Sequence, residues 1–382
     1  MKTNALILKV YLIVLSFLLT TCNTSNKKNA EKKSGKNPDL LQVLTQKIAQ
    51  GKYPKTNALL ISKKGKVVFE KYFNDYHEDS LQDVRSTTKS ITALLTGIAI
   101  DKGFIKSVHS PMLDYLHQYN KNTLQNWDQT KDSITIEHLL TMQTGIGCEQ
   151  FFGNMGLPDC EEKMFDQNDW VKYGLDQKMA FKPGTKWLYT GTAPMIMGAV
   201  VSEASNKSID AFASDYLFKP IGISHHYKWT KNRKTGRVFT AGNLRITPRN
   251  LLKIGHLVIN GGRHQGKRVI SEQMINSITS QKVTLPNNYS FFKTAGNTWK
   301  GQKPAKYGYY WYTEEVKMHN KTLTLKFTFG NGGNYIVLVP ELDNLVIIFT
   351  GSNYGKPILN KQPFDMMYQY IIPHFLKSNK GL

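Results

Sequence analysis

The sequence predicts an α+β fold in which one antiparallel sheet is built from both ends of the chain. Segments rich in β-branched and aromatic residues lie at residues 57–73 and again between residues 307 and 350, a composition typical of strands. Between them, from about residue 107 to about residue 277, apolar residues recur at helical spacing. With 382 residues and 40% hydrophobic content, the chain is long enough to bury a large core.

The first 21 residues are predicted to be a signal peptide. Lys2 and Lys9 precede the apolar run 10–19, which is too short to span a bilayer. The four residues that end at Cys22 resemble the cleavage box of bacterial lipoproteins, with Cys22 as the lipidated first residue. An ordinary signal peptide with an incidental cysteine is the alternative. Both interpretations predict export to the bacterial cell envelope, facing the periplasm or the outside.

Residues 22–38 are predicted to form a flexible cationic tether behind the lipidated Cys22. They are rich in Lys, Asn and Ser and lack large apolar residues. The formal net charge is +22, and removal of Lys2 and Lys9 with the signal peptide leaves +20, which favours anionic lipid or acidic envelope polymers. Beyond the tether the basic residues are dispersed and no nucleic-acid-binding motif is visible. We therefore expect a membrane partner through the lipid anchor and no nucleic acid partner.

Residues 39–382 are predicted to form the folded domain, and its first elements are a hairpin and a long helix. The hairpin covers residues 57–73, with its turn at residues 63–65. The helix begins near Ser86 and ends at Gly103, a residue type typical of the position after a helix. We expect an α/β lobe made of residues 39–106 and 300–382, and a helical lobe made of residues 107–299.

Residue types that open helices occur along the middle of the chain, and strand patterns return at its end. Thr135, Thr192 and Pro248 are residue types that open helices. The terminal helix, over residues 364–376, contains Pro373, which is expected to bend or end it. The four strands predicted to complete the sheet cover residues 307–316, 322–329, 335–339 and 345–350.

Ser86 and Lys89 form an S-x-x-K pair at the start of the first long apolar helix. Residues three apart share a helix face, so the Lys89 ammonium can reach the Ser86 hydroxyl. A serine hydroxyl becomes a nucleophile when a neighbouring base takes its proton, and this pattern supplies such a base. The pattern also begins at Ser25 and Ser290, where no helical periodicity follows. The alternative is a serine that merely caps its helix.

Five segments in chain order resemble the serine β-lactamase and penicillin-binding-protein superfamily, most of all its class C β-lactamase and esterase branch. The resemblance runs from about residue 56 to about residue 370. It implies a β-lactamase/transpeptidase-like fold and a serine hydrolase that needs no metal or organic cofactor. The segments that carry the resemblance are residues 84–91, 134–146, 181–191, 242–249 and 330–335.

The resemblance implies that Tyr189 carries the second chemical role. A phenolate beside a lysine ammonium is stabilised by the opposite charge. Tyr189 would then take the Ser86 proton and return it to the leaving group. A buried aromatic residue at a loop–helix junction is the alternative. In this sequence Gly191 replaces the Asn of the Y-x-N pattern that is frequent in the branch, which removes an amide that would contact substrate.

A second departure lies at Gly330, where a glycine-rich run replaces the usual K-T-G or H-T-G motif. The lost cationic group ordinarily helps to hold a substrate carboxylate, so the sequence fits the esterases and amidases similar to 6-aminohexanoate-dimer hydrolase better than an efficient β-lactamase. A backbone N–H near Asn331, Gly332 or Gly333 is expected to join the Ser86 N–H in an oxyanion hole. A glycine-rich hairpin bend is the alternative.

Cys148 and Cys160 flank a loop that contains Gly and Pro. In an oxidising envelope compartment these two cysteines are able to form a disulfide, while two unpaired thiols are the alternative. They lack metal-ligand spacing. We expect no metal site in this chain.

Together these features predict an exported serine hydrolase that cleaves a small-molecule ester, amide or peptide through a Ser86 acyl-enzyme. A peptidoglycan DD-peptidase or a weak β-lactamase is the alternative with similar chemistry. A non-catalytic envelope-binding protein with the same fold is the alternative of another class. A binding role does not require Ser86, Lys89 and Tyr189 together, so the intact set favours an enzyme. The sequence leaves the oligomeric state open.

Overall fold

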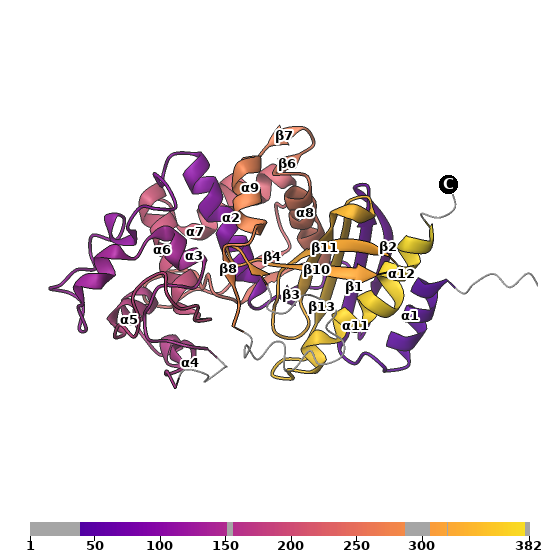
Figure 1. The fold of residues 1–382 in the computed structure, drawn as a ribbon, viewed down its shortest axis with the longest axis horizontal. Helices are drawn as coiled ribbons and strands as arrows, with labels where there is room; N and C mark the ends of the chain where they lie inside the picture. The colour runs from indigo at the N-terminus through magenta and orange to yellow at the C-terminus, as the bar shows by residue number, and fades with distance from the viewer. Residues whose placement is uncertain (1–38, 151–155, 287–305, 319, 379–382) are drawn as a thin grey trace, which may run out of the picture. The chain divides into compact units, whose positions relative to one another are not determined.

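An eight-stranded antiparallel sheet joins the two ends of the domain (Figure 1). Its strand order is β2-β1-β13-β12-β11-β10-β9-β8. The two N-terminal strands pair with the last strand of the chain, because Leu60 lies opposite Ile348 in the β1–β13 ladder. The strands are β1 (Thr56–Lys63), β2 (Lys66–Tyr72), β8 (Val283–Thr284), β9 (Lys306–Tyr307), β10 (Tyr312–Met318), β11 (Lys321–Phe327), β12 (Tyr335–Val339) and β13 (Leu345–Gly351).

The computed structural model describes residues 39–150, 156–286, 306–318 and 320–378. The predicted signal peptide, Cys22 and the tether lie outside these residues. Within them, no helix is long and apolar enough to cross a membrane. The α+β fold expected from the sequence, with a sheet contributed by both ends of the chain, is confirmed.

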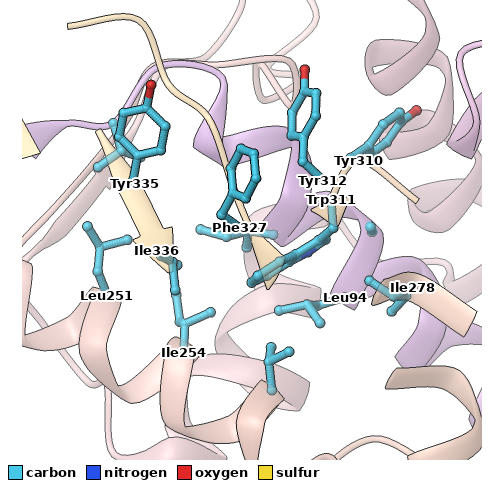
Figure 2. Close-up of a cluster of buried hydrophobic side chains, with 14 of the residues drawn as sticks. Leu94, Leu251, Ile254, Ile278, Tyr310, Trp311, Tyr312, Phe327, Tyr335 and Ile336 are labelled. Atoms are coloured by element: carbon cyan, nitrogen blue, oxygen red, sulfur yellow. The ribbon is translucent and has the colours of Figure 1, made fainter. Parts of the chain in front are cut away.

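Helices cover both faces of the sheet, which explains why β12 and β13 are buried at every position. Figure 1 shows α1, α11 and α12 on one side of the sheet and α8 on the other. Successive residues of a strand point to opposite faces. In Figure 2, Ile336 points toward Leu251 and Ile254 of α8, while the Tyr335 ring packs against Phe364 of α11, with centroids 5.4 Å apart.

The middle of the chain is mainly helical, as predicted. α3 begins after Thr135, whose side chain accepts a hydrogen bond from the His138 N–H. α8 begins at Pro248 and packs on the sheet. The helices from N- to C-terminus are α1 (Leu40–Ala49), α2 (Thr87–Asp101), α3 (Ile136–Leu140), α4 (Cys160–Phe165), α5 (Trp170–Asp176), α6 (Thr192–Ser205), α7 (Ile209–Ala213), α8 (Pro248–Ile259), α9 (Glu272–Thr279), α11 (Gln362–Met366) and α12 (Ile372–Ser378).

Two smaller sheets complete the described part of the domain. The three-stranded one has the order β3-β5-β4, with β3 (Gln82–Asp83), β4 (Tyr227–Trp229) and β5 (Leu244–Ile246). Strand β3 directly precedes α2 in the chain, so its pairing with β5 fixes the direction from which the chain enters that helix. The two-stranded one pairs β6 (Arg263–His264) with β7 (Lys267–Arg268).

Two predicted elements differ in detail from the structure. The strand expected over residues 307–316 is interrupted between β9 and β10, where Tyr310 has a φ of 59° and leaves the extended conformation. The terminal helix continues through Pro373. A wider π-helical turn at Met367–Ile371 separates α11 from α12 just before the proline, and such turns accommodate a break in the helical hydrogen-bond pattern.

The aromatic run at residues 310–312 belongs to the core. Tyr310, Trp311 and Tyr312 are all at most 3% exposed. Figure 2 shows Trp311 close to Leu94 of α2, within the cluster that joins the helices to the sheet. The Trp311 indole N–H donates to the Ser90 carbonyl at 3.3 Å, and the Ser90 hydroxyl donates to the Tyr310 carbonyl at 2.6 Å. These contacts anchor α2 against the sheet immediately behind the S-x-x-K pair.

Candidate active site

Ser86 is the residue that precedes α2, and its hydroxyl does not cap the helix. It accepts a hydrogen bond from Lys89 Nζ at 3.1 Å instead. The side chain is partly exposed, whereas the residues that follow it in α2 are buried. The capping alternative for this serine is therefore not what the structure shows. A hydroxyl that is paired with an amine and open to solvent has the arrangement of an activated nucleophile.

Lys89 is 2% exposed, which is rare for a lysine without dedicated partners. Its ammonium donates to Ser86 Oγ and, at 2.7 Å, to the carbonyl of Ala241. That carbonyl belongs to a segment bound along α2, because the Thr92 hydroxyl donates to the neighbouring Thr240 carbonyl at 3.0 Å. Residues 242–249 carry part of the family resemblance, but sequence reasoning did not identify the preceding Ala241 as the second acceptor for Lys89.

The backbone is strained just before the nucleophile. Arg85 has a φ of 50°, in the left-handed region that side chains rarely adopt. Asp83 holds this conformation, since its carboxylate accepts from the Arg85 N–H at 3.0 Å and lies 3.2 Å from Arg85 Nε. The Arg85 guanidinium also lies over the Tyr354 ring, 4.5 Å from its centroid. Strain of this kind is concentrated at functional sites.

Tyr189 lies next to the Ser86–Lys89 pair, as predicted for a residue more than 90 positions away in the sequence. The Lys89 ammonium is 5.1 Å from the centroid of its ring. Tyr189 is 6% exposed, and its carbonyl accepts a hydrogen bond from the Gln150 N–H at 2.7 Å. The structure thus brings the three predicted catalytic residues together.

Glu161 is a residue of this site that sequence reasoning did not identify. A Cβ atom added to Gly191 would lie 2.1 Å from Glu161 Oε2, so the carboxyl occupies the space beside Gly191. That oxygen is buried and has no hydrogen-bond partner among the described residues, while the side chain also hydrogen bonds to Gln150. Burial raises the pKa of Glu161, and the positive charge of Lys89 partly opposes that shift. The signal for this residue in the sequence was Gly191, which stands where the Y-x-N pattern of the family has Asn.

A disulfide holds Glu161 in place. Cys148 and Cys160 are bonded, with Cα atoms 5.6 Å apart, and both are almost fully buried. Asp159 caps α4 by accepting from the Glu161 N–H at 2.9 Å. The disulfide therefore connects the segment that contains Gln150 to the helix that carries Glu161, and the side chains of these two residues hydrogen bond to each other.

The glycine-rich run contacts the nucleophile helix through Gly330. A Cβ atom at this position would lie 2.1 Å from the Val84 carbonyl oxygen. The N–H groups of two predicted oxyanion residues already have acceptors, since Gly332 donates to Asn360 Oδ1 at 2.8 Å and Gly333 donates to the Gly330 carbonyl at 3.3 Å. The side-chain oxygen of Asn331 accepts from the Gly355 N–H, in the segment that follows β13. The second oxyanion donor stays a prediction.

Lys361 is a buried lysine, as Lys89 and Lys131 are, and it lies beside the start of the glycine-rich run. It is 5% exposed, and its ammonium lies 5.6 Å from the centroid of the Phe329 ring. It donates to the Pro357 carbonyl at 3.0 Å. Burial lowers the pKa of Lys361 to about 8. Nothing in the sequence distinguished this lysine from the many exposed ones.

The fold and the paired Ser86 and Lys89 side chains place the chain in the class of β-lactamase-type proteins. The family model named Beta-lactamase matches residues 42–363. The chain belongs to the Beta-lactamase family, whose members are serine hydrolases that act on amide or ester bonds.

Curated relatives match only parts of the chain. A β-lactamase of Escherichia coli K12 is 26% identical over 149 residues, which cover 39% of this chain and 35% of that protein. A protein of Escherichia coli O157:H7 assigned as a D-alanyl-D-alanine carboxypeptidase is 22% identical over 242 residues, covering 57% of this chain and 55% of the other. The chain thus spans about a third to about half of the length of these relatives.

Solved structures share the fold over most of the chain. A Bacillus anthracis protein assigned as a 6-aminohexanoate-dimer hydrolase superposes with a TM-score of 0.68 at 17% identity, covering 87% of this chain and 82% of that one. A penicillin-binding protein homologue from Pyrococcus abyssi, described as octameric, gives a TM-score of 0.62 at 19% identity, with 87% and 76% covered. At this level of identity the likeness confirms the β-lactamase/transpeptidase-like fold alone.

Proposed function

We propose that this protein is an exported, lipid-anchored serine hydrolase that cleaves an ester or amide through an acyl-enzyme on Ser86. The observation that carries the proposal is the Ser86 hydroxyl, which leaves its helix uncapped and accepts from Lys89 Nζ at 3.1 Å. The placement of Tyr189 over the Lys89 ammonium supports a shared proton-transfer unit. Family membership supports the reaction class.

The proposed reaction begins with attack of Ser86 Oγ on the substrate carbonyl. The proton of the hydroxyl passes to the Lys89–Tyr189 pair, and the carbonyl oxygen becomes an oxyanion held by backbone N–H groups. Collapse of this intermediate breaks the bond to the leaving group, which takes a proton from the same pair. Water then attacks the acyl-enzyme by the reverse route and releases the acid and free Ser86.

Export and anchoring are part of the proposal. The apolar run after Lys2 and Lys9, the lipoprotein-like residues that end at Cys22, and the cationic tether support them. The Cys148–Cys160 disulfide agrees with an oxidising envelope compartment. A bacterial envelope location, either periplasmic or external, follows from these features, as does a membrane partner through the lipid on Cys22.

A peptidoglycan-directed DD-peptidase or a weak β-lactamase is the second candidate function. The relatives named as β-lactamase and D-alanyl-D-alanine carboxypeptidase favour it. Gly191 and Gly330 weigh against it, because the Y-x-N amide and the cationic strand residue of such enzymes are both missing.

Labelling of the folded domain with a fluorophosphonate, followed by intact and peptide mass spectrometry, tests the nucleophile. We expect one adduct on Ser86. Ser86→Ala should abolish labelling and lower ester turnover by at least about 10³-fold, with a change in stability of no more than about 0.5 kcal/mol. Ser280→Ala, at an exposed serine, is the matched control. Full activity of Ser86→Ala would reject the proposal, and a folded wild type that labels nowhere would favour a binding protein.

A further inference from the structure

We infer that Glu161 sets the substrate class of this site, by favouring acyl compounds that carry no carboxylate beside the scissile bond. The inference rests on the proposed function, because it deepens the assignment of Ser86 as the nucleophile. It names a specificity-determining residue that lies far from the S-x-x-K pair in the sequence and comes from a different helix, α4.

The Glu161 carboxyl lies beside Gly191, the position where the Y-x-N pattern would have the amide side chain of Asn. Gly191 follows Tyr189 by two positions, and a Cβ atom there would lie 2.1 Å from Glu161 Oε2. A side chain on Gly191 and the carboxyl of Glu161 therefore exclude each other. Glu161 Oε2 is buried and has no hydrogen-bond partner among the described residues. This oxygen lies beside Gly191, two positions from Tyr189, and no described residue uses it in a hydrogen bond that would stabilise the fold.

The charges around the site explain why the carboxyl discriminates. The charged groups that face Glu161 are Lys89, Arg85 and Asp159. Lys89 is engaged with Ser86 and Ala241, and Arg85 is engaged with Asp83 and the Tyr354 ring.

Neither cation forms a direct ion pair with Glu161 within the described residues. Burial raises the pKa of Glu161, so at a pH above its folded-state pKa a substrate carboxylate brought to Ser86 would meet a second negative charge. Like charges placed together at a binding site cost several kcal/mol. An amide in the same place would instead donate a hydrogen bond to that carboxylate.

The glycine-rich run also disfavours a substrate with a carboxylate. A lysine or histidine that would hold a substrate carboxylate is missing from residues 330–333. Lys361 is the competing source of positive charge, since it lies beside Phe329 at the start of that run. Its ammonium donates to the Pro357 carbonyl and is buried. The experiment has to separate repulsion by Glu161 from attraction by Lys361.

Benzylpenicillin and its methyl ester form a matched pair of probes that differ only in the carboxylate. The rate of Ser86 acylation by each is measured by mass spectrometry in the wild type, Glu161→Gln and the control Glu162→Gln, which alters an exposed neighbour on the same helix. At a pH above the folded-state pKa of Glu161, we expect the wild type to favour the methyl ester. Glu161→Gln should raise the relative rate with benzylpenicillin at least about tenfold, and Glu162→Gln should not.

A second variant tests the same inference if Glu161→Gln does not fold. Glu161→Ala combined with Gly191→Asn removes the carboxyl and places an amide in the vacated space, and it should shift the preference in the same direction. An unchanged preference in both folded variants would overturn the inference and leave Glu161 as a packing residue. A wild type that favours benzylpenicillin would also overturn it, in favour of Lys361.

Failure of the proposed function gives a different pattern. If neither probe acylates any variant, fluorophosphonate labelling decides whether Ser86 is the nucleophile, and binding of the two probes is measured by calorimetry in a Ser86→Ala background. Tighter binding of benzylpenicillin alone on adding Glu161→Gln would still support discrimination by Glu161. Equal binding with and without Glu161→Gln would overturn it.

Discussion

Gly330 and Gly191 stand on two sides of the nucleophile, and each marks a place where the chain departs from a motif of its family. An added Cβ atom would come within 2.1 Å of another atom at both positions. At Gly330 that atom is the Val84 carbonyl oxygen, part of the backbone that enters α2. At Gly191 it is the end of the Glu161 side chain. The first contact belongs to the architecture, whereas the second is a replaceable group that sets the chemistry.

Gly330→Ala should therefore have the largest effect of the substitutions considered. The Val84 carbonyl also accepts from the Thr87 N–H at 3.2 Å, so it cannot move without disturbing the first turn of α2. We expect a loss of at least about 3 kcal/mol in the free energy of unfolding, typical of severe overpacking, together with loss of Ser86 acylation. Urea denaturation measures the first and fluorophosphonate labelling the second. Near-wild-type stability would show that the loop relaxes easily.

The contrast also shows what the sequence was able to reveal. Ser86 and Lys89 were found because helical spacing places them on one face, and local spacing is visible in one segment. Tyr189 required a family resemblance, since its approach to Lys89 depends on how α6 packs against α2. Both strand-rich ends were predicted from composition, and the helical pattern between them predicted that they share one sheet, which β1 and β13 join.

No local pattern in the sequence allowed Glu161 to be predicted. Its helix, α4, is six residues long and carries no distinctive spacing. Its position depends on a disulfide and on the absence of a side chain at Gly191, two conditions set by tertiary contacts. The oxyanion prediction was limited in the same way, because the hydrogen bonds that occupy the Gly332 and Gly333 N–H groups come from Asn360 and from the turn itself.

Removal of the disulfide should have the next largest effect and should act on the Glu161 side alone. The two cysteines are 12 positions apart, and a loop of that size is stabilised by about 2 to 3 kcal/mol. We expect the Cys148→Ser, Cys160→Ser variant to lose that amount in urea denaturation. It should also lose the preference for the methyl ester of benzylpenicillin, while Ser86 is still labelled. Unchanged stability and preference would separate the disulfide from the placement of Glu161.

Gly191→Ala should cost less than Gly330→Ala, about 1 to 2 kcal/mol, because a side chain can retreat where a backbone cannot. The decisive measurement is a double-mutant cycle with Glu161→Ala. Removing the carboxyl should recover most of the loss at Gly191, since the two residues are in contact and their effects are not additive. Glu161→Ala should leave the loss caused by Gly330→Ala unchanged. Equal behaviour of the two glycines in this cycle would remove the distinction between them.

The smallest expected effect is a change in how stability depends on pH. Burial raises the pKa of Glu161 above 4.5, the ordinary value for this carboxyl. The folded protein therefore keeps a proton that the unfolded chain has already released, and the stability contributed by that proton is lost as the pH rises through the folded-state pKa. Glu161→Gln does not titrate, so its stability relative to the wild type should increase as the pH rises from 4.5 to the folded-state pKa of Glu161.

Thermal unfolding across that range measures the difference, with Glu162→Gln as the control that should stay parallel to the wild type. A gap between Glu161→Gln and the wild type that stays constant, or that narrows with rising pH, would mean that Glu161 ionises as easily as an exposed carboxyl. Burial would then not control the charge on the Gly191 side of the site.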